Sequence, residues 1–114
     1  MANSTFEIKK NRDDVISILV KYYKYSGGAH GYYEYIPYNI DLRKGNFIAL
    51  KDIFKDNVDY KMLINKEIEN QIKEMRKNEK YIDKIYEFHG IKENQKFYLQ
   101  DGKIVIFFDL YDIA

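Results

Sequence analysis

Apolar and polar residues alternate along three stretches near the start of the chain, which is the period of a β-strand. Residues 5–10, TFEIKK, predict a short opening strand, and residues 15–25 predict a second strand that is apolar on both faces. A third is predicted from residue 32 to about residue 42, where the even positions form an apolar row: Ile36, Tyr38, Ile40 and Leu42. Because Pro37 cannot donate a ladder hydrogen bond, we expect this strand to lie at a sheet edge or to carry a bulge there.

The period changes to three and four residues in the middle of the chain, which is typical of an amphipathic α-helix. This helix is predicted from about Asp59, as its N-cap, to Asn78. Its apolar stripe comprises Tyr60, Leu63, Ile64, Ile68, Ile72 and Met75. Ahead of it, FIALKDIFKD predicts an extended piece and a short helical turn, with Ile53 and Phe54 pointing inward. Residues 79–96 predict a second short helix ending near Gly90, followed by a loop.

The chain closes with a predicted β-hairpin around Asp101-Gly102, a turn dipeptide flanked by alternating apolar residues. Residues 104–110 are apolar on both faces, so we expect the last strand to be central or covered. This order of elements predicts an α+β fold, a mostly antiparallel sheet with one long helix packed across a face. We expect residues 1–114 to form a single domain, cut from a longer protein.

The composition narrows the classes of partner. The 19 basic and 18 acidic residues nearly cancel, and lysines alternate with glutamates along the predicted helix, so we expect no nucleic-acid binding. The chain has no cysteine, which excludes disulfides and thiol chemistry. No apolar run approaches the ~18 residues of a membrane span, and the N-terminus lacks a secretory signal pattern. We expect a monomer that makes no membrane contact through this domain.

The stretch YYKYSGGAHGYYEYIPY, residues 22–38, places seven tyrosines around a glycine-rich turn. Tyr23 and Tyr25 share one face of the second predicted strand, and Tyr33 and Tyr35 share one face of the third. If that face is exposed, the rings form a surface suited to stacking on sugar rings or meeting a protein partner. If helices cover it, the rings belong to the core. The residues leave both readings open.

The same turn carries the chain's candidate chemistry. Ser26 and His30 are its one sequence-local nucleophile and base pair, and no nucleophile-elbow pattern surrounds Ser26. His30 and His89 lack metal-ligand spacing, and SGGAHG lacks the ending of a phosphate loop. We therefore expect no catalytic residue, no metal and no cofactor. Gly27 and Gly28 are assigned to the geometry of the turn. The candidate ligand-binding residues are Tyr23, Tyr25, His30, Tyr33 and Tyr35.

Three motifs occur in order along the chain. They comprise Gly27, Gly28, Ala29 and His30; Asn39, Asp41, Leu42, Gly45, Leu50, Asp52, Ile53 and Phe54; and Tyr111, Asp112, Ile113 and Ala114. In this order they resemble the extracytoplasmic C-terminal domain of RsiV-type anti-sigma factors, which also occurs in PdaC-type peptidoglycan deacetylases. That domain family is otherwise of unknown function.

The resemblance implies a domain that is not an enzyme and that lies outside a Gram-positive cell or anchored at its surface. In the anti-sigma branch the domain binds lysozyme, and in the deacetylase branch the chemistry lies in a separate metal-dependent domain. We therefore expect a binding module for cell-wall glycan or a lysozyme-like protein. The alternative is a structural or regulatory domain that packs on a neighbouring domain of its parent chain, such as a polysaccharide deacetylase.

Overall fold

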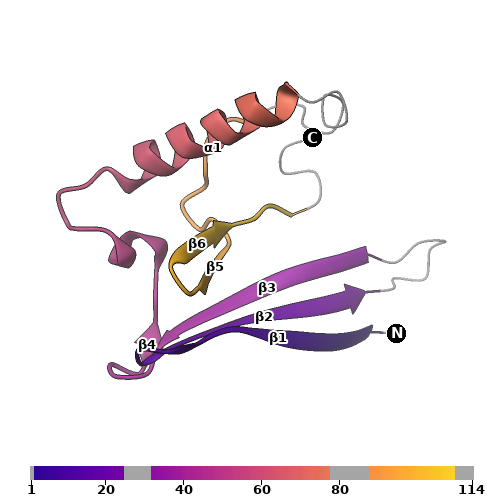
Figure 1. The fold of residues 1–114 in the computed structure, drawn as a ribbon. Helices are drawn as coiled ribbons and strands as arrows, with labels where there is room; N and C mark the ends of the chain where they lie inside the picture. The colour runs from indigo at the N-terminus through magenta and orange to yellow at the C-terminus, as the bar shows by residue number, and fades with distance from the viewer. Residues whose placement is uncertain (1, 25–31, 78–87, 110–114) are drawn as a thin grey trace.

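The computed structural model describes residues 2–24, 32–77 and 88–109 (Figure 1). The first half of the chain forms an antiparallel sheet in the order β1-β2-β3-β4. Its strands are β1 (Ala2–Arg12), β2 (Val15–Lys24), β3 (Tyr32–Asp41) and the two-residue β4 (Asn46–Phe47). The three predicted strands are confirmed. β4 pairs only with Ile40 and Asp41 of β3. At Pro37, β3 therefore has a described neighbouring strand on one side only, β2, and the predicted edge position is confirmed.

The second half forms a smaller unit. A 3₁₀ turn, η1 (Leu50–Ile53), leads into helix α1 (Tyr60–Arg76), and β5 (Phe97–Gln100) pairs with β6 (Lys103–Ile106) in a separate two-stranded sheet. Asp59 caps α1 as predicted, because its Oδ1 accepts a hydrogen bond from the Met62 amide at 3.2 Å. The Asp101-Gly102 turn is confirmed, with Gly102 at a φ of +73° that glycine adopts without steric cost.

The structure corrects two expectations. The last strand ends at Ile106, and within the described part of the chain it pairs with β5 alone, so it is not central. It is covered only in part, because Ile106 packs against the core whereas Ile104 is 36% exposed. Phe54 points inward and stacks on Tyr60 with ring centroids 5.9 Å apart, whereas Ile53 lies at the surface. A four-residue 3₁₀ turn can direct only one side toward the core, and Leu50 is the residue of η1 that is buried there. The second short helix predicted before Gly90 falls mainly within residues 78–87, outside the described residues.

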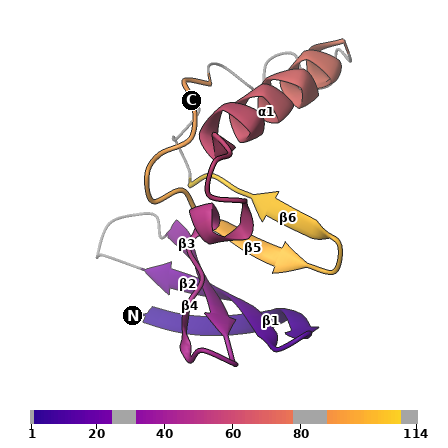
Figure 2. The same cartoon turned by 90° about the vertical axis from the view of Figure 1, so that its left-hand side faces the viewer.

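The elements stack in layers, with the hairpin β5–β6 between the large sheet and α1 (Figures 1 and 2). Among the residues that the structure describes, the most buried apolar side chains are Leu50 of η1, Ile64 of α1 and Phe97 of β5. Around them pack Phe54, Tyr60, Ile68, Ile91, Leu99 and Ile106. The predicted α+β class is confirmed, and the helix packs over the closing hairpin.

Two buried polar side chains attach the hairpin to the large sheet. Ser17 of β2 and Asn39 of β3 lie opposite each other, and Ser17 Oγ donates to Asn39 Oδ1 at 2.6 Å. Ser17 Oγ in turn accepts from the Leu99 amide at 2.9 Å, and Asn39 Nδ2 donates to the Phe97 carbonyl at 3.0 Å. Buried polar groups cost stability unless they are hydrogen-bonded, so this network specifies where β5 sits on the sheet.

Candidate ligand-binding surface

The register of β2 and β3 assigns alternate residues to the two faces of the large sheet. Tyr23 lies opposite Tyr33, and Lys21 opposite Tyr35, on the face that also carries Ser17. We call this side the hairpin face, because β5 docks on it through Ser17. The other side, the open face, carries Phe6, Ile8, Ile18, Val20, Ile36, Tyr38, Ile40 and Phe47.

An aromatic cluster lies on the hairpin face at the opposite end of β2 and β3 from Ser17 and Asn39. The rings of Tyr23 and Tyr33 are 5.0 Å apart and tilted by 51°. Tyr33 is 55% exposed and Tyr35 is 38% exposed, whereas Tyr23 is half-buried. We call Lys21, Tyr23, Tyr33 and Tyr35 the tyrosine platform. The exposure of Tyr33 and Tyr35 answers the question left open by the sequence, because these two rings lie at the surface and outside the core.

Lys21 is the member of the platform that the sequence did not single out. Its Nζ lies 4.0 Å from the centroid of the Tyr33 ring and 5.9 Å from that of Tyr35, within range of a cation–π interaction. The available signal was the alternation of β2, which places Lys21 on the same face as Tyr23. Only the pairing of β2 with β3 brings the ammonium close to the two exposed rings.

A charged pair on β1 borders the platform. Glu7 lies opposite Leu19, and its carboxylate pairs with Lys9 Nζ at 2.5 Å. The hydrogen bond from Lys9 lowers the pKa of Glu7, and the nearby charge of Lys21 lowers it further. The same bond raises the pKa of Lys9, whose Nζ also lies 5.1 Å from the Tyr98 ring of the hairpin. Both groups therefore remain ionised near neutral pH, and a neutralised pair flanks the rings.

Only part of the predicted site falls within the described residues. The structure brings Tyr23 and Tyr33 together and places Tyr35 on the same face. The other predicted residues, Tyr25, Gly27, Gly28 and His30, lie outside the described residues. The ligand-binding roles of Tyr23, Tyr25, His30, Tyr33 and Tyr35 stay predictions.

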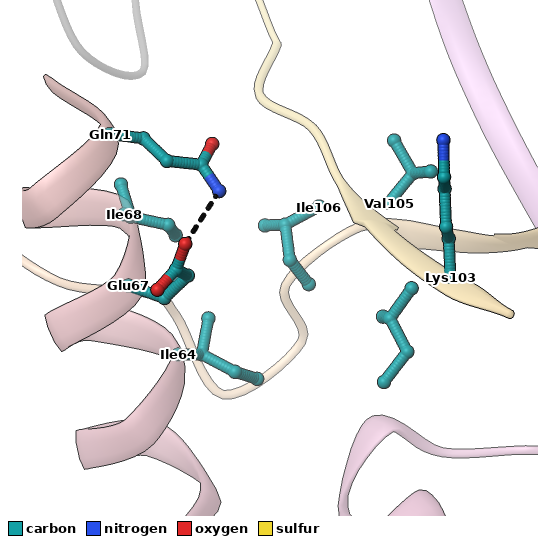
Figure 3. Close-up of a pocket in the computed structure, with 8 residues that line it drawn as sticks. Ile64, Glu67, Ile68, Gln71, Lys103, Val105 and Ile106 are labelled. Carbon is teal, nitrogen blue, oxygen red and sulfur yellow. Dashed lines mark hydrogen bonds between the residues drawn. The ribbon is translucent and has the colours of Figure 1, made fainter. Parts of the chain in front are cut away.

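Apart from the platform, a hollow lies between α1 and β6 (Figure 3). It has a volume of about 430 Å³, and Ile106 points from β6 toward α1 across it. Its apolar lining is Ile64, Ile68, Ile104, Val105 and Ile106, and its polar lining is Glu67, Gln71 and Lys103. Gln71 Nε2 donates to Glu67 Oε1 at 3.1 Å. This hollow leaves a mainly apolar surface beside β6.

Neither a metal cluster nor a membrane-spanning helix occurs among the described residues. Within residues 2–24, 32–77 and 88–109, no three histidine, aspartate or glutamate side chains gather closely enough to hold a metal ion. None of the helices in this part of the chain combines the length and apolar character needed to cross a membrane.

The fold and surface define a small α+β domain with an exposed aromatic platform, and comparison with known proteins places it in a family. The family model described as "Protein of unknown function (DUF3298)" matches residues 51–114. The model described as "Deacetylase PdaC" matches residues 1–33. The chain belongs to the DUF3298 family, and the similarity to PdaC deacetylases expected from its motifs is confirmed.

Individual relatives agree with this assignment. The chain is 31% identical over 117 residues to the Peptidoglycan-N-acetylmuramic acid deacetylase PdaC of Bacillus subtilis (strain 168), covering 98% of this chain and 24% of that protein. A crystal structure of a DUF3298 family member from Bacteroides fragilis matches 99% of this chain and 46% of its own, with a TM-score of 0.78 and 28% identity. The chain thus spans about a quarter of the deacetylase and about half of this solved relative.

A solved structure of lower sequence identity shows the same fold. The crystal structure of a DUF3298 family protein from Pseudomonas aeruginosa PAO1 has a TM-score of 0.73 at 19% identity, over 99% of this chain and 52% of that chain. Neither the family description nor the partial match to the deacetylase assigns a catalytic role to the region that this chain represents.

Proposed function

We propose that this domain is a non-catalytic binding module of the cell envelope that recognises a glycan chain through the tyrosine platform. The carrying observation is the pair of exposed rings, Tyr33 and Tyr35, held on a paired strand with Lys21 Nζ within about 6 Å of both ring centroids. Tyrosine offers a large flat contact surface and a polar hydroxyl at low entropic cost, which suits it to stacking on a sugar ring. A site on paired strands also keeps its rings in register without a ligand.

The similarity to one named relative supports the cell wall as the setting. The Bacillus subtilis protein is named as a deacetylase of N-acetylmuramic acid in peptidoglycan, and this chain aligns with a quarter of it. A domain that holds the enzyme near its polymer is consistent with that partial match. The proposal places the domain outside the cell or anchored at its surface, in a Gram-positive bacterium like that relative.

A binding assay with matched variants tests the platform. The domain is mixed with purified peptidoglycan sacculi and sedimented, alongside a Tyr33→Ala/Tyr35→Ala double variant and a Tyr38→Ala control. Tyr38 is 40% exposed, about as much as Tyr35, but it lies on the open face of the same strand. Its replacement therefore removes an exposed tyrosine ring from outside the proposed binding surface. We expect the double variant to lose about tenfold or more in affinity, and the control to bind as the unmodified domain does.

Two results would change the proposal: one concerns the binding surface and the other concerns the ligand. If sacculi bind and the double variant remains folded by circular dichroism yet binds equally well, the platform is not the site. A lysozyme-like protein is the other ligand expected of this domain, and immobilised lysozyme provides the parallel arm. Capture by lysozyme alone, sensitive to the same two tyrosines, would keep the surface and change the ligand from glycan to protein.

A second candidate function is favoured by the open face. Phe47 is 69% exposed, Phe6 is 66% exposed and Ile8 is 58% exposed. The hairpin and α1 both lie on the other side of the large sheet (Figure 2). Large contiguous apolar surfaces are uncommon on monomeric proteins and mark interaction sites. We propose as the alternative that the domain packs through this face on a neighbouring domain of its parent chain. A monodisperse monomer that binds no hydrophobic dye would count against it.

A further inference from the structure

The electrostatics of the tyrosine platform point to a narrower ligand class. We infer that the platform selects glycans that carry a carboxylate, and that Lys21 is the residue that discriminates them. The inference rests on the proposed glycan-binding function and goes beyond it, because stacking on tyrosine rings alone does not distinguish a neutral sugar from an acidic one.

Lys21 is held in place by its strand and its neighbours. It is half-buried, it lies opposite Tyr35 on β3 and Thr5 on β1, and its Nζ rests over the Tyr33 ring. An exposed lysine normally loses rotamer entropy when it binds a ligand. The contacts with two rings already restrict this side chain, so part of that cost is met before a ligand arrives.

The positive charge of Lys21 is not cancelled by an ion pair. No described carboxylate lies within ion-pair distance of its Nζ, which contacts the two rings instead. The carboxylates on the flanking strands have other partners, since Glu7 pairs with Lys9 at 2.5 Å and Glu34 lies 3.5 Å from Lys96. The platform therefore presents one cation without an ion-pair partner among the described carboxylates, 4.0 Å from the Tyr33 ring and 5.9 Å from the Tyr35 ring.

This arrangement matches one chemical class of sugar. A carboxylate bound to Lys21 Nζ places the sugar that carries it over Tyr33 or Tyr35, because the ammonium lies beside both rings. N-acetylmuramic acid without a stem peptide carries such a carboxylate on its lactyl ether, whereas N-acetylglucosamine is neutral. Only N-acetylmuramic acid can add the charged contact to stacking. At an exposed site this contact favours it over N-acetylglucosamine by about two- to fivefold in affinity.

The experiment compares two peptide-free tetrasaccharides by titration. One contains N-acetylglucosamine only, and the other alternates N-acetylglucosamine with N-acetylmuramic acid. We expect the acidic tetrasaccharide to bind about two- to fivefold more tightly, with a preference that shrinks as NaCl is raised toward 1 M, where the screening length is ~3 Å. Free stem peptide forms a third arm, and we expect it to bind more weakly than either glycan.

Two variants separate charge recognition from support of the rings. Lys21→Met keeps an apolar stem over Tyr33 and removes the charge; we expect it to bind both tetrasaccharides equally, within about twofold of the affinity of the unmodified domain for the neutral one. Lys21→Arg retains the charge and should retain the preference. If Lys21 only supported the rings, Lys21→Met would weaken both ligands alike and leave the preference intact.

The outcomes keep the two proposals apart. Equal affinity of the unmodified domain for both tetrasaccharides, or a preference that survives in Lys21→Met, would overturn the role of Lys21 and leave glycan binding standing. Binding of neither tetrasaccharide would remove the proposed function itself. Tight binding of the stem peptide would assign the carboxylate to peptide and contradict the inference about the sugar.

Discussion

The two faces of the large sheet differ in a way that hydrophobicity alone does not explain. The hairpin face is the more polar one, yet it is the face on which β5 docks, through Ser17 and Asn39. The open face carries a continuous apolar row and is left uncovered by every described element. Directed hydrogen bonds therefore specify which face the hairpin covers, and the apolar face remains available for another layer of protein.

One strand provides a matched pair of side chains for this comparison. Tyr35 and Tyr38 on β3 are 38% and 40% exposed, but they point to opposite faces. Tyr35 has the Lys21 ammonium 5.9 Å from its ring, whereas Tyr38 has the Phe47 ring at 6.3 Å. Equal exposure with a charged neighbour on one side and an apolar neighbour on the other predicts different ligands for the two faces.

The largest expected effect comes from breaking the attachment of the hairpin. Asn39→Ala removes the acceptor of Ser17 and leaves the Phe97 carbonyl without its donor in a buried site. We expect the free energy of unfolding to fall by about 2–4 kcal/mol, measured by urea denaturation. Asn57→Ala, at an exposed loop position, is the control and should change it by less than about 0.5 kcal/mol. Equal effects of the two variants would contradict a stabilising role of the hydrogen bonds of Ser17 and Asn39.

The next effect concerns ligand affinity on the two faces. Tyr35→Ala should weaken glycan binding by about 0.5–1.5 kcal/mol, the range for one aromatic contact, while Tyr38→Ala should leave it unchanged. Titration calorimetry with the acidic tetrasaccharide measures both. A loss in Tyr38→Ala that matched the loss in Tyr35→Ala would move the site off the hairpin face.

A smaller effect is the pH dependence of the contact between β1 and the hairpin turn. Hydrogen bonds from Lys10 and Arg12 lower the pKa of Asp101 below its ordinary value. Its stabilisation is therefore complete above the unfolded-state pKa and is lost as the pH falls below about 4 through the folded-state value. Asp101→Asn keeps a turn dipeptide compatible with Gly102, and it should flatten the acid side of the curve of urea midpoint against pH. An unchanged acid slope would contradict this contact.

The smallest effect tests whether the open face is bare. Phe6 is 66% exposed, so Phe6→Ser should change the free energy of unfolding by less than about 0.5 kcal/mol while lowering the binding of a hydrophobic dye. A stability loss of several kcal/mol would show that Phe6 is packed in solution, by a second copy or another segment. Sedimentation at several protein concentrations then identifies which.

The local elements were predictable because each depends on a short-range pattern. Alternation, the Asp59 cap and the Asp101-Gly102 turn predicted the strands, helix and hairpin. The side of the sheet that β5 covers was not predictable, since β2 is apolar on both faces and the deciding groups, Ser17 and Asn39, meet across two strands. The tyrosines were found because they cluster in sequence, and Lys21 was missed because its role depends on cross-strand pairing.

The most direct test of the central claim resolves the tyrosine rings individually. Ring signals of Tyr33, Tyr35 and Tyr38 are assigned by NMR with single-site variants and followed while the acidic tetrasaccharide is added. We expect saturable shifts of Tyr33 and Tyr35 at one common Kd, with Tyr38 unmoved on the opposite face. Shifts confined to Tyr38, or a titration that moves none of the three rings, would contradict this claim.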